Sequence, residues 1–404
     1  MKHTFLTTVL ALTAVSVSAA PKAKKQKPQQ TDTAYVFTDI QTVPVSPVDN
    51  QSSSGTCWSF AGTGLLESEV LRQGKDTLNL SEMWIVRHTY LDKAVKYVRL
   101  HGAGSFSSGG NTHDVLTILR NHGLVPQEAY EGLRYSRDGL HRHGELDTVL
   151  AGYMKAVVAA KNRTLSPVWQ DGLNGILDAY LGQCPEKFTY KGREYTPKSF
   201  AEAMGLRPDD FVSFTSFTHH PFYTRFAVEI PDNWAWETSA NVPVDELIEI
   251  VDHALENGFA VNWSADVSEK GFRYNEGFAI VPVDRPEQVA GSDMARWTGL
   301  TKEQLARMSH RITGPMPEKT ITQEMRQEAF DNYETTDDHG MVIVGTAHDQ
   351  WGNKFYKVKN SWGKRGRYKG FFYVSEPFVR YKTINILVNR AAVPQTVADK
   401  FTDL

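Results

Sequence analysis

One cysteine of the sequence stands where a nucleophile would be activated. Cys57 follows the loop Asn50–Thr56 and opens a run of residues that predicts a helix. Free backbone N–H groups and the helix dipole at such an N-terminus favour negative charge, which lowers the pKa of a thiol and enriches the nucleophilic thiolate. Gln51, six residues earlier, can turn its amide toward the same point and donate to an oxyanion together with the Cys57 backbone N–H. The loop alone leaves a buried structural cysteine as the alternative.

Two residues near the C-terminus supply what a thiol nucleophile needs. His339 precedes one predicted strand and Asn360 closes the next, so the turn at 349–353 places them on neighbouring strands. Imidazole titrates in the range needed to take up and return the thiol proton. Asn360 would accept a hydrogen bond from the imidazole and hold the ring in plane, and Trp362 would shield that bond from water. Cysteine, imidazole and amide together predict acyl transfer through a thioester.

The elements that must position these residues fall into a helical first part and a strand-rich last part. A helix is expected from Cys57 to Leu71, a second after the N-cap Ser81, and a third over 112–121. Further helix-like runs lie at 146–162, 168–181 and 244–257, and runs that predict an antiparallel meander lie at 340–345, 354–359, 371–374 and 383–388. Residues 285–328 are expected to combine helix and loops. The order predicts an α+β fold in two lobes, with the site in the cleft between them.

The first residues have the pattern of a secretory signal peptide. A basic start is followed by an apolar run from Phe5 to Val17 and by the small residues Ser18, Ala19 and Ala20. The run is shorter than the roughly 20 residues that a membrane-spanning helix needs. We therefore expect cleavage after Ala19, export to a periplasmic or extracellular space, and no stable membrane anchor. Residues 20–35 are polar and basic and predict a flexible leader.

Composition excludes several other classes of protein. The 404 residues carry a net charge of −3, which provides no footprint for nucleic acid, and two cysteines cannot form a disulfide-rich scaffold. Cys184 has no obvious base near it in the sequence and is expected to be a small buried residue. The pairs His141/His143 and His219/His220 lack companions at metal-ligand spacing, so we expect surface or loop histidines. No metal and no cofactor are expected.

The motifs Gln-x5-Cys-Trp, His-Gly and Asn-Ser-Trp-Gly together resemble the papain family of cysteine peptidases. His339 lies 282 residues after Cys57, whereas the papain family places its His and Asn about 130–150 residues after the cysteine. More than a hundred residues are therefore inserted. That size, and the form Gln-x-Ser-Ser-Gly-x-Cys-Trp-x-Phe, resemble the bleomycin hydrolase / aminopeptidase C branch. Further matching stretches are Gly109-Gly110, 180–188 and 241–245.

The resemblance implies roles for particular residues. Cys57 would be the nucleophile, His339 the general base and acid, Asn360 its orienting partner, and Gln51 part of the oxyanion hole. Gly109 and Gly110 match paired glycines that present backbone to bound substrate, although a plain loop before a helix is equally compatible with them. The resemblance also implies a papain-like fold with a helical lobe at 36–130, a mostly helical insertion at 131–325, a β lobe at 326–390 and a C-terminal tail at 391–404.

The sequence departs from this family at both ends. Cytosolic members have no signal peptide, and in relatives a terminal arm lies in the cleft and measures substrate N-termini. Here we expect the tail after Pro394 to stop before such an arm and to dock elsewhere through Val397, Phe401 and Leu404. Peptides are the expected substrates, and hexameric relatives make a homo-oligomer possible. The alternatives to an aminopeptidase are an open-cleft endopeptidase and, less favoured, a non-catalytic peptide-binding protein.

Overall fold

A computed structural model describes residues 34–161, 164–283, 312, 314–402 and 404. The expected signal peptide, residues 20–33 of the expected leader and most of the 285–328 stretch lie outside these residues. Tyr35, the last residue of that leader, is only 2% exposed and packs with its ring centroid 4.5 Å from that of Phe278. The prediction of a flexible leader up to residue 35 is therefore wrong at its end. Among the described helices, none has the length and apolar character needed to cross a bilayer.

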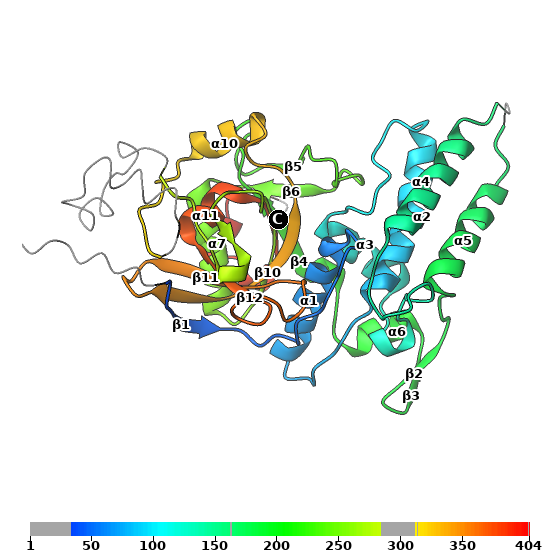
Figure 1. The fold of residues 1–404 in the computed structure, drawn as a ribbon, viewed down its shortest axis with the longest axis horizontal. Helices are drawn as coiled ribbons and strands as arrows, with labels where there is room; N and C mark the ends of the chain where they lie inside the picture. The colour runs from blue at the N-terminus through cyan, green and yellow to red at the C-terminus, as the bar shows by residue number, and fades with distance from the viewer. Residues whose placement is uncertain (1–33, 162–163, 284–311, 313, 403) are drawn as a thin grey trace, which may run out of the picture. The chain divides into compact units, whose positions relative to one another are not determined.

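The first part of the described chain is mostly helical. Their bounds are α1 Cys57–Arg72, α2 Glu82–Arg99, α3 Thr112–His122, α4 Gly144–Val158, α5 Val168–Leu181 and α6 Pro197–Ala203. Ser81 caps α2, as expected, by accepting a hydrogen bond from the backbone N–H of Trp84 at 3.0 Å. Figure 1 shows α2, α4 and α5 side by side, with the short hairpin β2 Phe188–Tyr190 and β3 Arg193–Tyr195 near α6.

The second part is built on one large mixed sheet. Its strand order is β5-β6-β4-β13-β7-β10-β11-β12-β9-β8, and β1 pairs with β10. The strands are β1 Phe37–Thr42, β4 Phe211–Thr215, β5 Arg225–Ala227, β6 Thr238–Asn241, β7 Val261–Ala265, β8 Phe272–Arg273, β9 Phe278–Ala279, β10 His339–Asp349, β11 Lys354–Lys359, β12 Phe371–Ser375 and β13 Thr383–Asn389. The helices of this part are α7 Val244–Glu256, α10 Gln323–Asp331, α11 Glu376–Lys382 and α12 Gln395–Ala398. The predicted α+β class is confirmed.

The sheet extends beyond the predicted β lobe. Strands β4 to β9 come from residues 211–279, within the stretch expected to be a mostly helical insertion. The last strand also departs from a simple meander, because β13 pairs with β4 and β7 and not with β12. Every residue of β4 and β7 is buried, so these strands lack the alternation of apolar and polar residues that marks a half-exposed strand.

Helix α1 lies between the sheet and the other helices. All its residues from Trp58 to Val70 are buried, because α1 contacts β10 as well as α2 and α3. Glycines allow this close packing. A Cβ added at Gly62 would stand 2.4 Å from Cγ2 of Val115 on α3, and one added at Gly64 would stand 3.3 Å from Cγ2 of Val342 on β10. The nucleophile candidate is therefore carried by a helix that is enclosed on all sides.

The C-terminal segment packs against the sheet and α7. The Phe401 ring lies 6.2 Å from that of Phe214 on β4 and 5.9 Å from that of Tyr223, measured between centroids. Lys400 pairs with Glu246 of α7 at 2.9 Å. These contacts fix the path of residues 395–402.

We predict that Phe401→Ala lowers the free energy of unfolding by about 3 kcal/mol, because Phe401 is only 9% exposed and a buried aromatic ring leaves a cavity. Tyr333→Ala is the matched control, since Tyr333 is 85% exposed and should cost little. Urea denaturation of both variants measures the difference. Equal midpoints for the two variants would show that the Phe401 contacts contribute nothing.

Candidate active site

Cys57 is the first residue of α1. Some features around its thiol lower the thiol pKa and others raise it. The backbone N–H groups of Gly340 and Trp58 favour the thiolate, but burial dominates and raises the pKa of the Cys57 thiol to about 12. The charges of Asp337 and Asp232 act in the same direction as burial. The lowered thiol pKa expected from the helix N-terminus is therefore wrong for this geometry. A half-buried thiol whose pKa is raised in this way needs a base beside it before it becomes a nucleophile.

His339 and Asn360 meet as the sequence predicts. His339 opens β10 and Asn360 follows β11, and Nε2 of His339 donates to Oδ1 of Asn360 at 2.8 Å. The Trp362 ring lies 4.8 Å from the imidazole, centroid to centroid, at 30°. Burial lowers the pKa of His339 to about 4, opposed by the hydrogen bond to Asn360. Since Nε2 is engaged with Asn360, Nδ1 is the nitrogen left to take up a proton at neutral pH.

One backbone contact brings this histidine to the cysteine. A Cβ added at Gly340 would stand 3.2 Å from Cα of Trp58 and 3.4 Å from the carbonyl oxygen of Cys57. The first residues of β10 therefore pack directly on the first turn of α1, and a glycine after His339 permits this approach. The predicted proximity of the two lobes at this point follows from the contact.

Gln51 is fixed by the segment that follows Asn360. Its backbone N–H donates to the carbonyl of Ser361 at 2.8 Å, and its Oε1 accepts from Oγ of Ser361 at 2.5 Å. The anchored oxygen leaves the amide NH2 as the side-chain donor that can serve an oxyanion. No role for Ser361 is predicted from the sequence, although this residue stands inside the quoted Asn-Ser-Trp-Gly motif.

Gly110 lies beside the first turn of α1, and an acidic side chain fills part of the space beside Gly109. A Cβ on Gly110 would stand 2.7 Å from Cε2 of Trp58, and a Cβ on Gly109 would meet the Asp232 carboxylate at 2.2 Å. The carbonyl of Gly109 accepts a hydrogen bond from Nζ of Lys93. Neither Asp232 nor Lys93 is predicted from the sequence, because neither belongs to a recognisable motif.

Two other sequence predictions need correction. His141 and His143 are 6% and 0% exposed, because their loop pairs with the loop before Cys57: the Ser53 N–H donates to the His141 carbonyl at 3.0 Å. Both lie in a loop, as one of the two predicted alternatives has it, but they are buried and are not at the surface. Cys184 is only half-buried, and its Sγ lies 3.7 Å from Nε2 of His88, so a base does stand near it. Burial nevertheless raises the pKa of Cys184 to about 11 and lowers that of His88 to about 3.

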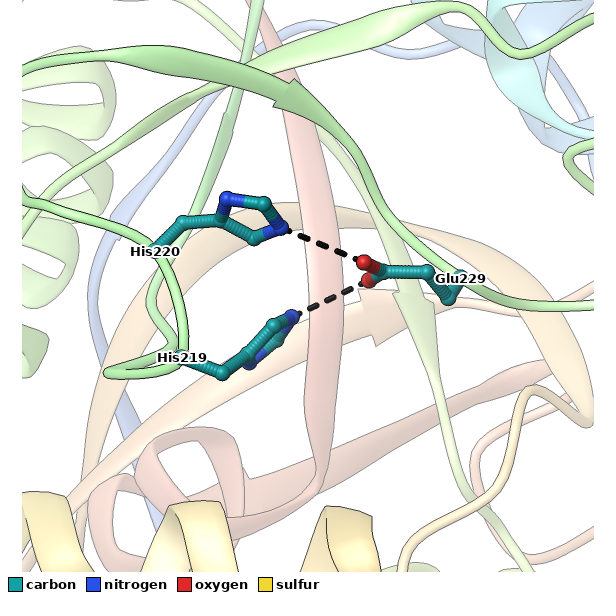
Figure 2. A group of neighbouring side chains, drawn as sticks. All are labelled: His219, His220 and Glu229. Carbon is teal, nitrogen blue, oxygen red and sulfur yellow. Dashed lines mark hydrogen bonds and ion pairs between the residues drawn. The ribbon is translucent and has the colours of Figure 1, made fainter.

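His219 and His220 have a carboxylate partner that spacing did not reveal. Figure 2 shows both rings directed at Glu229, with Nε2 of His219 at 3.0 Å from one oxygen and Nε2 of His220 at 3.2 Å from the other. The three ligand atoms lie within 4.8 Å of one another and could hold one divalent cation. The hydrogen bonds already satisfy both carboxylate oxygens, so the geometry does not require an ion, and the absence of a metal stays a prediction.

Comparison with known proteins gives consistent results along the chain. A model described as "Papain family cysteine protease" matches residues 28–165, and one described as "Peptidase C1-like family" matches residues 291–403. "Cysteine proteinase 1, mitochondrial" of Saccharomyces cerevisiae is 22% identical over 100% of this chain and 86% of its own length. "Aminopeptidase C" of Streptococcus thermophilus is 22% identical over 93% of this chain and 87% of its own length.

A solved structure agrees in fold. The crystal structure of pepw from Lactobacillus rhamnosis superposes with a TM-score of 0.68 at 20% identity, covering 90% of this chain and 84% of that one. Fold and site together define a papain-like cysteine-type peptidase. Within that class the chain is similar over most of its length to the proteins named cysteine proteinase 1 and aminopeptidase C.

We predict that Gln51→Ala lowers kcat by on the order of 10²–10³ with KM little changed, the cost of removing one oxyanion donor in comparable sites. Ser361→Ala, which removes only the anchor of the Gln51 oxygen, should cost less. Asn360→Ala should also cost less, because neighbouring residues still hold His339 in part. Steady-state kinetics on one peptide separates the cases. A rise in KM at constant kcat would make Gln51 a substrate-binding residue.

The reactivity of Cys57 should follow the titration of His339. In a Cys184→Ala background, where Cys57 is the sole cysteine, alkylation of Cys57 by iodoacetamide should fall only below about pH 4. His339 is neutral above its pKa of about 4 and can then take the thiol proton. In His339→Ala the rate should rise only in the alkaline range, because burial raises the thiol pKa to about 12. A parent profile that falls near pH 6.5, the ordinary value for histidine, would contradict this prediction.

Proposed function

We propose that the protein hydrolyses peptides from their amino ends, with Cys57 as nucleophile and His339 as general base and acid. Asn360 orients the imidazole, Gln51 and the Cys57 backbone N–H stabilise the oxyanion, and Trp362 shields the His339–Asn360 bond. The observation that carries the proposal is the contact between the first residues of β10 and the first turn of α1. It packs the start of the strand that opens with His339, whose imidazole bonds Asn360, against the turn that opens with Cys57, the only cysteine at a helix N-terminus among the described residues.

The reaction follows from the positions of these groups. As Sγ attacks the peptide carbonyl, the thiol proton passes to Nδ1 of His339. The carbonyl oxygen becomes an oxyanion, to which the Gln51 amide donates a hydrogen bond. The imidazolium then donates that proton to the departing amine, which leaves as the C–N bond breaks and a thioester forms. Water attacks the thioester with His339 as base, releasing the carboxylic acid and restoring the thiol.

The raised pKa of Cys57 and the lowered pKa of His339 share burial as their main cause. Burial opposes the appearance of either charge alone, whereas proton transfer creates both charges side by side, where they attract in a medium of low dielectric. The site therefore favours transfer from Sγ to the imidazole over loss of a proton to solvent. A neutral thiol that ionises only with its partner is also less exposed to oxidation.

Action on the amino end is supported by the relatives named aminopeptidase C. The open-cleft endopeptidase is the second candidate; it would accept peptides whatever their N-terminus. We also propose that residues 1–19 direct export, that residues 36–404 form one peptidase unit, and that copies assemble as an oligomer. N-terminal sequencing of the mature protein and its mass in solution test export and assembly.

The test of the function is one peptide offered with a free amine and with an N-acetyl group. We expect the free-amine form to be hydrolysed faster by the parent and by Cys184→Ala, because Cys184 lies outside the site. Cys57→Ala should lose all but a trace of activity while keeping its circular dichroism spectrum, since only the sulfur is removed. Equal rates on the two peptides would favour the endopeptidase, and an inactive Cys184→Ala would mean that the nucleophile is misassigned.

A further inference from the structure

A loop of the sheet crosses to the helices beside the nucleophile. Residues 228–237, here called the strap, connect β5 with β6. Nε1 of Trp234 donates to Oδ2 of Asp114 in the first turn of α3 at 2.8 Å. Nζ of Lys96 on α2 lies 3.6 Å from the centroid of the Trp236 ring. The strap is therefore tied to two helices at its far end.

Hydrogen bonds within the strap, and contacts of Glu229 near its start, also fix its conformation. Asn233 is 4% exposed; its amide donates to the carbonyls of Val228 at 3.1 Å and Glu237 at 2.9 Å, and its Oδ1 accepts from the Glu237 N–H at 3.0 Å. Glu229 is bound by the two histidines of Figure 2. The residue that precedes Asn233 consequently has a fixed position.

That residue is Asp232, and its carboxylate lies against Gly109. Its two oxygens lie 2.2 and 2.3 Å from the point where a Cβ of Gly109 would stand, so the carboxylate covers the first of the paired glycines. Within the described ranges, no residue donates a hydrogen bond to Asp232 or forms an ion pair with it. Lys93 is the nearby cation, but its Nζ donates to the carbonyls of Ser107 and Gly109. The carboxylate thus keeps its acceptor capacity for an incoming group.

A second carboxyl group lies near the nucleophile. Asp337, two residues before His339, is close enough to Asp232 for their charges to interact: burial, then Asp232, then Asp338 raise its pKa to about 8. The charges of Asp232 and Asp337 both act on the Cys57 thiol as well. Asp114 and Lys93 also lie in this corner. The corner therefore holds more carboxyl groups than cations, and a bound cation would favour their ionised forms.

We propose that Asp232 binds the free α-ammonium of the substrate. An ammonium offers three N–H donors and a positive charge, which match an unpartnered carboxylate in a partly dry cleft. The strap then ends the cleft beyond Gly109, so a peptide enters with its amino end first. An acetylated peptide would instead bring an uncharged amide against the Asp232 carboxylate. The proposal rests on the peptidase function of Cys57 and deepens it.

The test compares Asp232→Asn with Glu237→Gln. Glu237 stands on the same strap with an exposed side chain, so its variant removes the same charge without touching Gly109. Each enzyme is assayed on one peptide with a free amine and on its N-acetyl form, with Cys57 alkylation as a check on the nucleophile. For Asp232→Asn we expect kcat/KM on the free amine to fall by on the order of 10- to 100-fold, as for loss of one partner of a partly buried charge pair.

The ratio of kcat/KM on the two peptides decides between the outcomes. Asp232→Asn should leave the acetylated peptide and the alkylation rate within a few-fold of the parent, so the preference for free amines collapses; Glu237→Gln should keep it. A parent that prefers free amines and an Asp232→Asn variant with the same preference would overturn the ammonium site while the peptidase function stands. Absence of any Cys57-dependent hydrolysis in the parent would overturn the proposed function itself. A fall on both peptides alike would also exclude Asp232 as an ammonium anchor.

Discussion

The packing of β10 on the first turn of α1 is the contact on which the site depends. Gly340 allows the strand to reach the helix, and the residue before it delivers the imidazole while the helix delivers the thiol. Neither element has freedom to move, because α1 is enclosed by helices and sheet, and β10 is paired with β1, β7 and β11. Catalytic groups held on regular elements in this way need little reorganisation during the reaction.

Burial of the reacting pair has a cost that the arrangement itself offsets. Removal of water makes an isolated thiolate or imidazolium unfavourable, as the shifts in the pKa of Cys57 and of His339 show. The same removal of water strengthens the attraction between the two charges once they form together. The charges of Asp232 and Asp337 raise the pKa of the Cys57 thiol further and so disfavour a free thiolate. The environment thus links ionisation of the nucleophile to the presence of its partner.

Much of the fold and of the site could be predicted from local sequence, and the reasons are specific. α1 and α5 begin and end near the predicted residues, α2 begins after its predicted cap Ser81, and the β10–β11 pair follows from two apolar runs and a short turn. The meeting of His339 and Asn360 follows from that pair. Gln51 is predictable from its distance to Cys57, but its anchor Ser361 is not, because a lone hydroxyl carries no pattern.

What the sequence did not show depends on contacts between distant segments. Strands buried on both faces, such as β4 and β7, have no alternation to read. The thiol pKa could not be judged from the helix N-terminus alone, since the opposing effect is desolvation by residues far along the chain. Glu229 joins His219 and His220 only through the β4–β5 loop and the strap, and Asp232 reaches Gly109 across 123 positions of sequence.

The strap has a consequence for how such an enzyme can diversify. It leaves the sheet between β5 and β6, at one end of the strand order, where β4, β13 and β7 separate it from β10. Insertions, deletions or exchanges in it alter none of the hydrogen bonds that hold His339 or Asn360. Asn233 holds the strap together through hydrogen bonds within the strap itself, so the strap can be exchanged as one unit. Substrate choice is thereby separable from bond cleavage, and lineages that share this catalytic core could exchange one strap for another without passing through an inactive ancestor.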